Sequence, residues 1–170
     1  MSDSQGLAML ERRRIEAKLI AHFYAVISET HGKEAAERII AESVRRSAVE
    51  QGAEMAKALG GSTSLKTFID AQELWTRGGA LQVEMKEASD KRFAFNVTRC
   101  EYARMYREMG LGHIGHLLSC QRDGTFCEGY DDKLKLKRTQ TIMQGASHCD
   151  FEYTYDDAAA AEAPSAKAGG

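Results

Sequence analysis

The chain has 170 residues, a formal net charge of −2, and a composition that is 43% hydrophobic and 28% charged. This length fits one domain that buries a core without help from disulfides. No basic excess points to a nucleic-acid partner, and the basic run Arg12–Arg14 is interpreted as a solvated helix face. No apolar stretch approaches the ~20 residues of a membrane span, so no membrane partner is expected.

The sequence favours a cytoplasmic protein. Its first residues, 1–6, lack the charged and then apolar regions of an export signal. Without such a signal, the four cysteines are expected to be reduced thiols: Cys100, Cys120, Cys127 and Cys149.

The N-terminal half predicts three helices. In the first, over 8–29, residues spaced three or four apart predict one apolar stripe: Leu10, Ile15, Leu19, Phe23, Val26 and Ile27. A second helix is expected over 33–59, ending at the glycines 60–61. A third is expected over 64–76, capped by Ser62 or Thr63.

The C-terminal half changes to alternating patterns. A hairpin is expected from strands over 81–85 and 93–97, joined by a turn at 89–91. Short helices follow over 101–109 and from about 111 toward Cys120, and Arg122–Gly124 is interpreted as a turn or loop. A strand over 134–142 and a last strand over 149–155 complete the pattern.

These elements predict an α+β fold: N-terminal helices followed by an antiparallel sheet of about four strands, as two hairpins with short helices inserted. Residues 1–156 are expected to form a single domain. Residues 157–170, rich in alanine and glycine, are expected to be a disordered tail.

Reactive side chains concentrate between Asn96 and Phe151. No Cys-x-x-Cys pair supports a zinc ribbon. His113 and His116 lie three apart on a predicted helix and could share a metal, but the interpretation as surface residues is preferred. No phosphate-binding glycine loop, dinucleotide fingerprint or Gly-x-Ser-x-Gly elbow is present. Classical nucleotide binding and serine hydrolysis therefore have no support.

Cysteine and arginine are the two residue types in this segment for which a chemical role can be argued. Arg122 near Cys120, or His148 beside Cys149, could activate a thiol, although inert buried cysteines are commoner. Arg138 lies in a half-apolar strand and needs an anionic partner, which is either an internal aspartate or a substrate carboxylate.

Four blocks in order resemble the L-2-amino-thiazoline-4-carboxylic acid hydrolase family: residues 96–100 (NVTRC), 117–123 (LLSCQRD), 137–145 (KRTQTIMQG) and 148–151 (HCDF). The resemblance implies hydrolysis of a small carboxylate-bearing heterocycle of the cyclic amidine or thiazoline type. For the name-giving substrate, water adds at the carbon between nitrogen and sulfur, and the ring opens to N-carbamoyl-L-cysteine.

The resemblance also implies roles for individual residues. Expected catalytic residues, as nucleophile, proton acceptor or metal ligand, are Cys120, Cys149, Asp123, Asp150 and His148. Expected substrate-binding residues, with an arginine on the carboxylate, are Arg138, Arg99, Thr139, Thr141 and Asn96. No cofactor is predicted, a bound metal is left open, and direct water attack stays an alternative to covalent catalysis.

Two further interpretations stay open. The ending Gly145…Cys149-Asp150-Phe151 is also similar to vinyl-reductase-like small-molecule-binding domains, which predicts a binding module for a small molecule or metal, without turnover. Alternatively, the front helices serve a helical interaction protein. Their length makes a homo-oligomer possible under any interpretation.

Overall fold

The computed structural model describes residues 6–156, so the expected tail over 157–170 lies outside the described residues. Two long helices, α1 (Met9–His31) and α2 (Lys33–Ala58), form a hairpin and confirm the first two predicted helices. Gly32 joins them with a φ of 87°, a conformation that favours glycine.

The predicted helix over 64–76 is broken into two. α3 (Leu65–Asp70) begins at Ser64, whose side chain accepts a hydrogen bond from the Thr67 amide at 3.1 Å, so the cap is neither Ser62 nor Thr63. Hydrogen bonds of the tighter three-residue type then interrupt the helix around Gln72. The chain continues as α4 (Glu73–Thr76) and a 3₁₀ turn over Arg77–Gly79.

A four-stranded antiparallel sheet follows, which confirms the predicted α+β class. Its strands are β1 (Leu81–Ala88), β2 (Arg92–Cys100), β3 (Leu134–Lys137) and β4 (Cys149–Tyr155). β1 and β2 form the predicted hairpin, and β4 pairs with both β2 and β3, in the order β1-β2-β4-β3.

The strand expected to run to Ile142 ends earlier, at Lys137. The reason is local: the backbone amides of Thr139 and Gln140 donate to the Asp150 carboxylate and not to a neighbouring strand. Beyond them, Thr141 caps a 3₁₀ turn over Ile142–Gln144.

The prediction of a loop at Arg122–Gly124 is wrong. After α5 (Glu101–Glu108), turns replace the helix expected from 111, and a π-helical turn (His116–Cys120) leads directly into α6 (Gln121–Tyr130). The glycines of this segment disfavour a helix, but the close packing of α6 against α2 stabilises one. A Cβ on Gly129 would meet the Val49 carbonyl oxygen at 1.9 Å.

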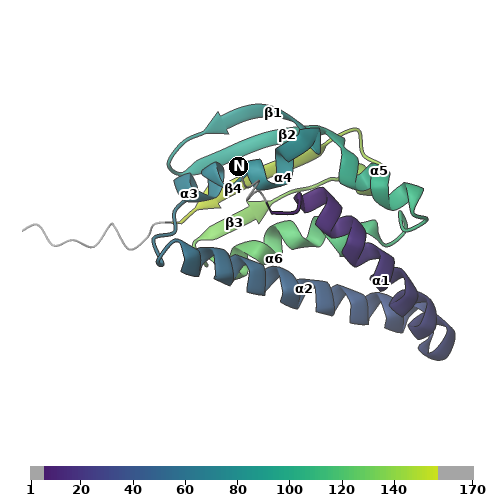
Figure 1. Ribbon diagram of the computed structural model, residues 1–170. Coiled ribbons are helices and arrows are strands. Elements are labelled where there is room, and N and C mark those ends of the chain that lie inside the picture. Colours follow the sequence, from purple (N-terminus) through teal and green to yellow (C-terminus); the bar gives the residue numbers. More distant parts are fainter. Residues whose placement is uncertain (1–5, 157–170) are drawn as a thin grey trace, which may run out of the picture.

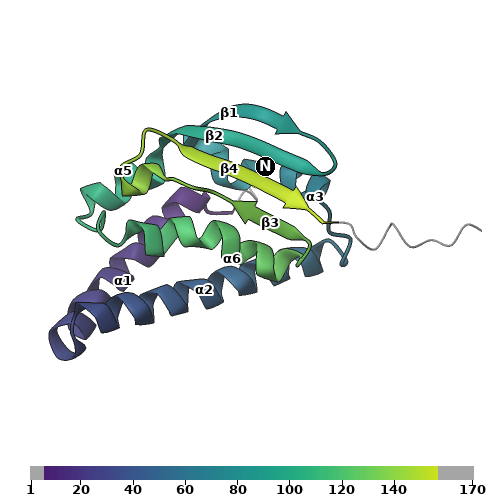
Figure 2. The same ribbon diagram turned by 180° about the vertical axis from the view of Figure 1, so that it is seen from behind.

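Seen from opposite sides, Figures 1 and 2 show α1, α2 and α6 gathered on one side of the sheet. The β2 and β4 side chains on that side are buried, among them Phe93, Phe95 and Tyr153. Asn96 and Asp150, paired in register, lie on the opposite face of the sheet.

α1 turns a different face to the core than its apolar stripe predicts. Its buried residues are Arg13, Ala17 and Tyr24, so Arg13 is not the solvated residue expected from the basic run. Four members of the predicted stripe are more than half exposed: Ile15, Leu19, Phe23 and Val26. The helix therefore has a second apolar face that residues 6–156 leave uncovered.

No helix in the described part of the chain is long and apolar enough to cross a membrane.

Candidate functional site

A cavity of about 90 Å³ lies between the inner face of the sheet and the helices. Its wall is mainly apolar and aromatic, with residues from α3, α4, α6, β2 and β4: Phe68, Trp75, Phe95, Phe126, Phe151 and Tyr153. Its polar lining consists of Arg13, Gln51, Gln72, Tyr102, Ser119, Arg122, Asp123 and Arg138, with three cysteines. A mainly apolar space with a few convergent polar groups is the usual form of a small-molecule site.

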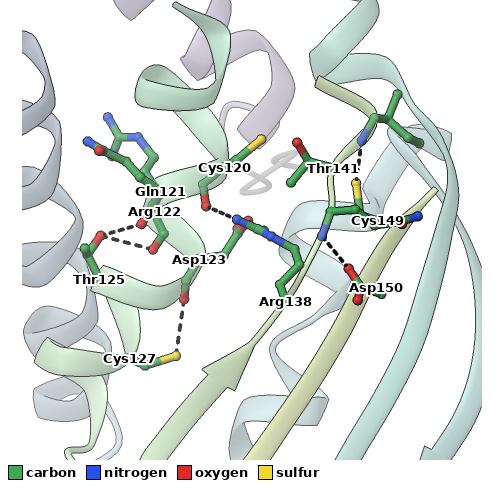
Figure 3. Close-up of polar contacts among 12 residues, drawn as sticks. Cys120, Gln121, Arg122, Asp123, Thr125, Cys127, Arg138, Thr141, Cys149 and Asp150 are labelled. Atoms are coloured by element: carbon green, nitrogen blue, oxygen red, sulfur yellow. Dashed lines mark hydrogen bonds and ion pairs between the residues drawn. The ribbon is translucent and has the colours of Figure 1, made fainter. Parts of the chain in front are cut away.

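An ion pair crosses this cavity from β3 to α6. Arg138, just beyond the end of β3, donates from Nη1 to Asp123 Oδ2 at 2.5 Å and from Nη2 to the Cys120 carbonyl at 2.8 Å (Figure 3). Its guanidinium also lies over the Phe151 ring, 4.9 Å from the centroid. The partner of Arg138 is thus the internal aspartate, one of the two alternatives left open by the sequence.

Asp123 has the electrostatics of a proton acceptor. Burial raises the pKa of its carboxyl group above the ordinary value, and Arg138 opposes this only in part. About 31% of the side-chain surface is accessible, and Asp123 is a lining residue of the cavity. No group within residues 6–156 donates a hydrogen bond to Oδ1, so this oxygen is available to a ligand or water.

Three thiols share the cavity wall: Cys100, Cys120 and Cys149. Burial raises the pKa of Cys120 to about 12, that of Cys100 to about 11, and that of Cys149 above its ordinary value. Neither Arg122 nor His148 activates them, so all three are neutral thiols at neutral pH. Cys127 is buried outside the cavity and donates to the Asp123 carbonyl.

At another part of the wall, two buried arginines share one carboxylate. Arg13 donates to Glu16 at 2.7 Å and to Gln51 Oε1 at 2.9 Å, and Arg122 lies 3.4 Å from the same Glu16. Burial, followed by the proximity of Arg13, lowers the pKa of Arg122 to about 10. Arg122 Nη1 is buried without a hydrogen-bond partner among the described residues.

The charges around the cavity do not balance. Three guanidinium groups (Arg13, Arg122 and Arg138) face two carboxylates (Glu16 and Asp123), which leaves one positive charge in a space of low polarity. A buried cation without a full set of acceptors is costly, and one anionic group beside Arg122 would supply both charge and acceptor.

Several expected site residues lie away from the cavity, around Asp150. Its carboxylate accepts hydrogen bonds from the Thr139 amide and hydroxyl and from the Gln140 amide. Burial alone would raise the pKa of Asp150, but these hydrogen bonds lower it below the ordinary value. Asp150 therefore fixes the loop before β4, and Thr139 serves this loop contact instead of lining the cavity.

The other expected residues also lie outside the cavity lining. Arg99 is 62% exposed and 3.7 Å from Glu101. His148 lies against Gln140 and Ser147, and Thr141 caps the 3₁₀ turn. Asn96 shares the outer sheet face with Asp150.

Of the ten expected site residues, the structure thus brings four together at the cavity: Cys120, Cys149, Asp123 and Arg138. Sequence reasoning missed Arg13, and it considered Arg122 only as a group that could activate Cys120. The sequence did contain a pattern that indicates burial of Arg122, because Leu118, Arg122 and Phe126 are four apart and share one buried helix face. The assumption of a loop concealed it.

In the part of the chain that the structure describes, no three His, Cys, Asp or Glu side chains are placed to hold a metal ion. His113 instead packs edge-on against the Tyr24 ring, with centroids 5.4 Å apart.

A wider hollow of about 440 Å³ adjoins the cavity, and both are lined by Gln51, Trp75 and Phe126. Residues 6–9, at the start of α1, border its other side. These three shared side chains separate the cavity from the hollow.

Helices on one face of a four-stranded antiparallel sheet, around a cavity with buried charges, define an α+β protein with a candidate small-molecule site. The chain belongs to the L-2-amino-thiazoline-4-carboxylic acid hydrolase family, whose sequence model matches residues 12–153. Comparison with curated proteins gives no match.

Two solved structures are similar in fold. The phenol-responsive sensory domain of the transcription activator PoxR, crystallised with phenol, is 14% identical; the match covers 84% of this chain and 74% of that one, with a TM-score of 0.50. A trafficking protein particle complex subunit 3 from Naegleria fowleri, covalently bound to palmitic acid, is 7% identical, with coverage of 86% and 96% and a TM-score of 0.47.

Proposed function

We propose that the protein hydrolyses a small, carboxylate-bearing cyclic amidine or thiazoline in the cavity between the sheet and α6. Family membership supports the reaction class. The observation that carries the proposal is the pairing, in one cavity, of Asp123, whose pKa is raised, with Arg122, whose Nη1 lacks an acceptor.

Arg122 is the residue we propose for the substrate carboxylate, in place of Arg138 or Arg99. Arg138 already donates to Asp123 and to the Cys120 carbonyl, and Arg99 lies outside the cavity. A carboxylate beside Arg122 supplies the missing acceptor and cancels the excess charge. A cavity of ~150 Å³ holds benzene, and this one measures about 90 Å³, so binding of the ring requires side chains of the wall, such as Gln51 and Gln72, to move aside.

The proposed chemistry begins at Asp123, which takes a proton from water. The hydroxide oxygen bonds to the ring carbon between nitrogen and sulfur. The carbon–sulfur bond then breaks, the sulfur receives the proton from Asp123, and the former hydroxyl proton moves to the ring nitrogen as the carbonyl forms. One water is consumed per ring, and Arg138 holds the orientation of the Asp123 carboxylate throughout. Cys120 and Cys149 contact the ring as neutral thiols.

The direct test is an assay for thiol release from 2-amino-thiazoline-4-carboxylate. We expect turnover by the unaltered chain and, since positioned acid–base catalysis contributes ~10²–10⁴-fold, a loss of that order in Asp123→Asn. Asp150→Asn is the matched control and is expected to keep its activity if its melting temperature is retained. Loss of activity in Asp150→Asn alone would move the site to the outer face of the sheet.

A second candidate, a binding module without turnover, is supported by the mainly aromatic wall of the cavity and by the three neutral thiols. The PoxR sensory domain, which was crystallised with phenol, is similar in fold. Saturable binding of the ring, measured by calorimetry, with no thiol release would favour this candidate.

For the compartment, we propose the cytoplasm. All four cysteines are free, as expected in a reducing environment.

A further inference from the structure

The outer face of α1 carries a regular seam of six residues. Arg12, Ile15, Leu19, His22, Val26 and Glu29 follow one another at alternating steps of three and four. This is the spacing of the a and d positions of a coiled coil, which meet a partner helix along one line. The members with large apolar side chains are strongly exposed: Ile15 by 52%, Leu19 by 58% and Val26 by 57%.

The seam lies away from the protein's own core. Residues of α1 that pack inward, Arg13, Ala17 and Tyr24, occupy the opposite part of the helix circumference. Phe23, at 52% exposure, flanks the seam on the solvent side. A contiguous apolar helix face of this kind is typical of an association surface.

The charges at its two ends identify the partner. Arg12 is exposed at the N-terminal end and Glu29 at the C-terminal end, and within residues 6–156 neither forms an ion pair. If a second copy of α1 lies antiparallel, about a two-fold axis between Leu19 and His22, Arg12 of each copy lies across from Glu29 of the other. The same axis sets Ile15 across from Val26 and Leu19 across from His22, so the seam is complementary to itself.

We propose that two copies of the chain form a dimer through this antiparallel pairing of α1. The pairing covers the exposed apolar side chains and joins opposite charges at both ends. A single helix pair buries less than the roughly 1,200–2,000 Å² of a standard interface, so the dimer dissociates on dilution. The cavity is not covered, because Arg13 faces it from the other side of α1.

The test is sedimentation velocity of the full chain over a dilution series. The unaltered chain is expected to pass from dimer to monomer, and Leu19→Glu weakens association on the order of 100-fold, because it buries a charge in both halves of the seam. Met85→Glu is the matched control: Met85 is 56% exposed but lies on the edge strand β1. A chain that is monomeric at every concentration would overturn the proposal. Dissociation by Met85→Glu but not by Leu19→Glu would also overturn it and would assign the interface to the edge strand.

A charge exchange tests the antiparallel register itself. Arg12→Glu and Glu29→Arg each place like charges at both ends of the homodimer, and each is expected to weaken self-association about tenfold. In an equimolar mixture of the two variants, both end contacts of the mixed dimer again join opposite charges, so association returns. A mixture that associates no better than the separate variants would contradict the register, and circular dichroism of each variant verifies the fold.

Discussion

At the scale of single residues, the cavity holds two kinds of side chain that could both act in catalysis, the Asp123 carboxylate and the cysteine thiols, and it affects them differently. Asp123 is half-buried, is held at one oxygen by Arg138, and has a raised pKa. The cavity thiols have pKa values too high to supply a thiolate near neutral pH. Environment, more than residue type, therefore favours Asp123 as the proton acceptor and water as the nucleophile of the proposed reaction.

This difference predicts the pH dependence of turnover. In the proposed mechanism the active form of Asp123 is the carboxylate, so kcat/KM is expected to rise as pH increases through its pKa and then to level off. Because that pKa is raised, the acid limb lies above the ordinary aspartate value of 3.8. A pH–rate profile that instead rises only toward pH about 12 would identify the Cys120 thiolate as the nucleophile.

At the scale of elements, sequence patterns predicted what is local. The two long helices and the β1–β2 hairpin follow from periodicity and from glycines at their ends. What the patterns could not predict depends on tertiary contacts. α6 contains two glycines and an Arg-Asp-Gly run that favour a turn, yet it is helical because it packs closely on α2.

The same limit applies to the candidate site. Sequence order placed Asp150, His148 and Arg99 near the cysteines, but their side chains lie outside the cavity lining, partly because strand neighbours alternate between the two faces of a sheet. Arg13, more than 100 positions from Arg122 in the chain, reaches the same Glu16. A contact of this kind depends on how α1 lies against α6, which no local pattern encodes.

Close packing of α6 on α2 is testable through two glycines of the same helix. A Cβ on Gly129 would lie 1.9 Å from the Val49 carbonyl oxygen, whereas a Cβ on Gly124 would meet nothing within 4 Å. Gly129→Ala is therefore expected to lower the free energy of unfolding by about 1–3 kcal/mol or more. Gly124→Ala, the matched control, is expected to raise it by about 0.5–1 kcal/mol. Urea denaturation measures both, and equal effects would contradict the close approach of the helices.

At the scale of the whole molecule, the sheet and helices enclose a compact charged cavity and present a separate apolar surface on α1. The wider hollow beside Trp75 and Phe126 adjoins the cavity. α1 takes part in both features, since Arg13 lines the cavity and Leu19 lies on the outer seam. The proposed dimer and the proposed site thus use opposite faces of one helix and can be altered independently.

The most direct test of the central claim is a crystal structure of Asp123→Asn with 2-amino-thiazoline-4-carboxylate, since this variant should bind the ring without opening it. We predict the intact ring in the cavity beside β4 and α6, with its carboxylate accepting hydrogen bonds from Arg122 and its ring carbon facing the side chain at position 123. A ring bound on the outer face of the sheet, near Asp150 and Arg99, would contradict the account.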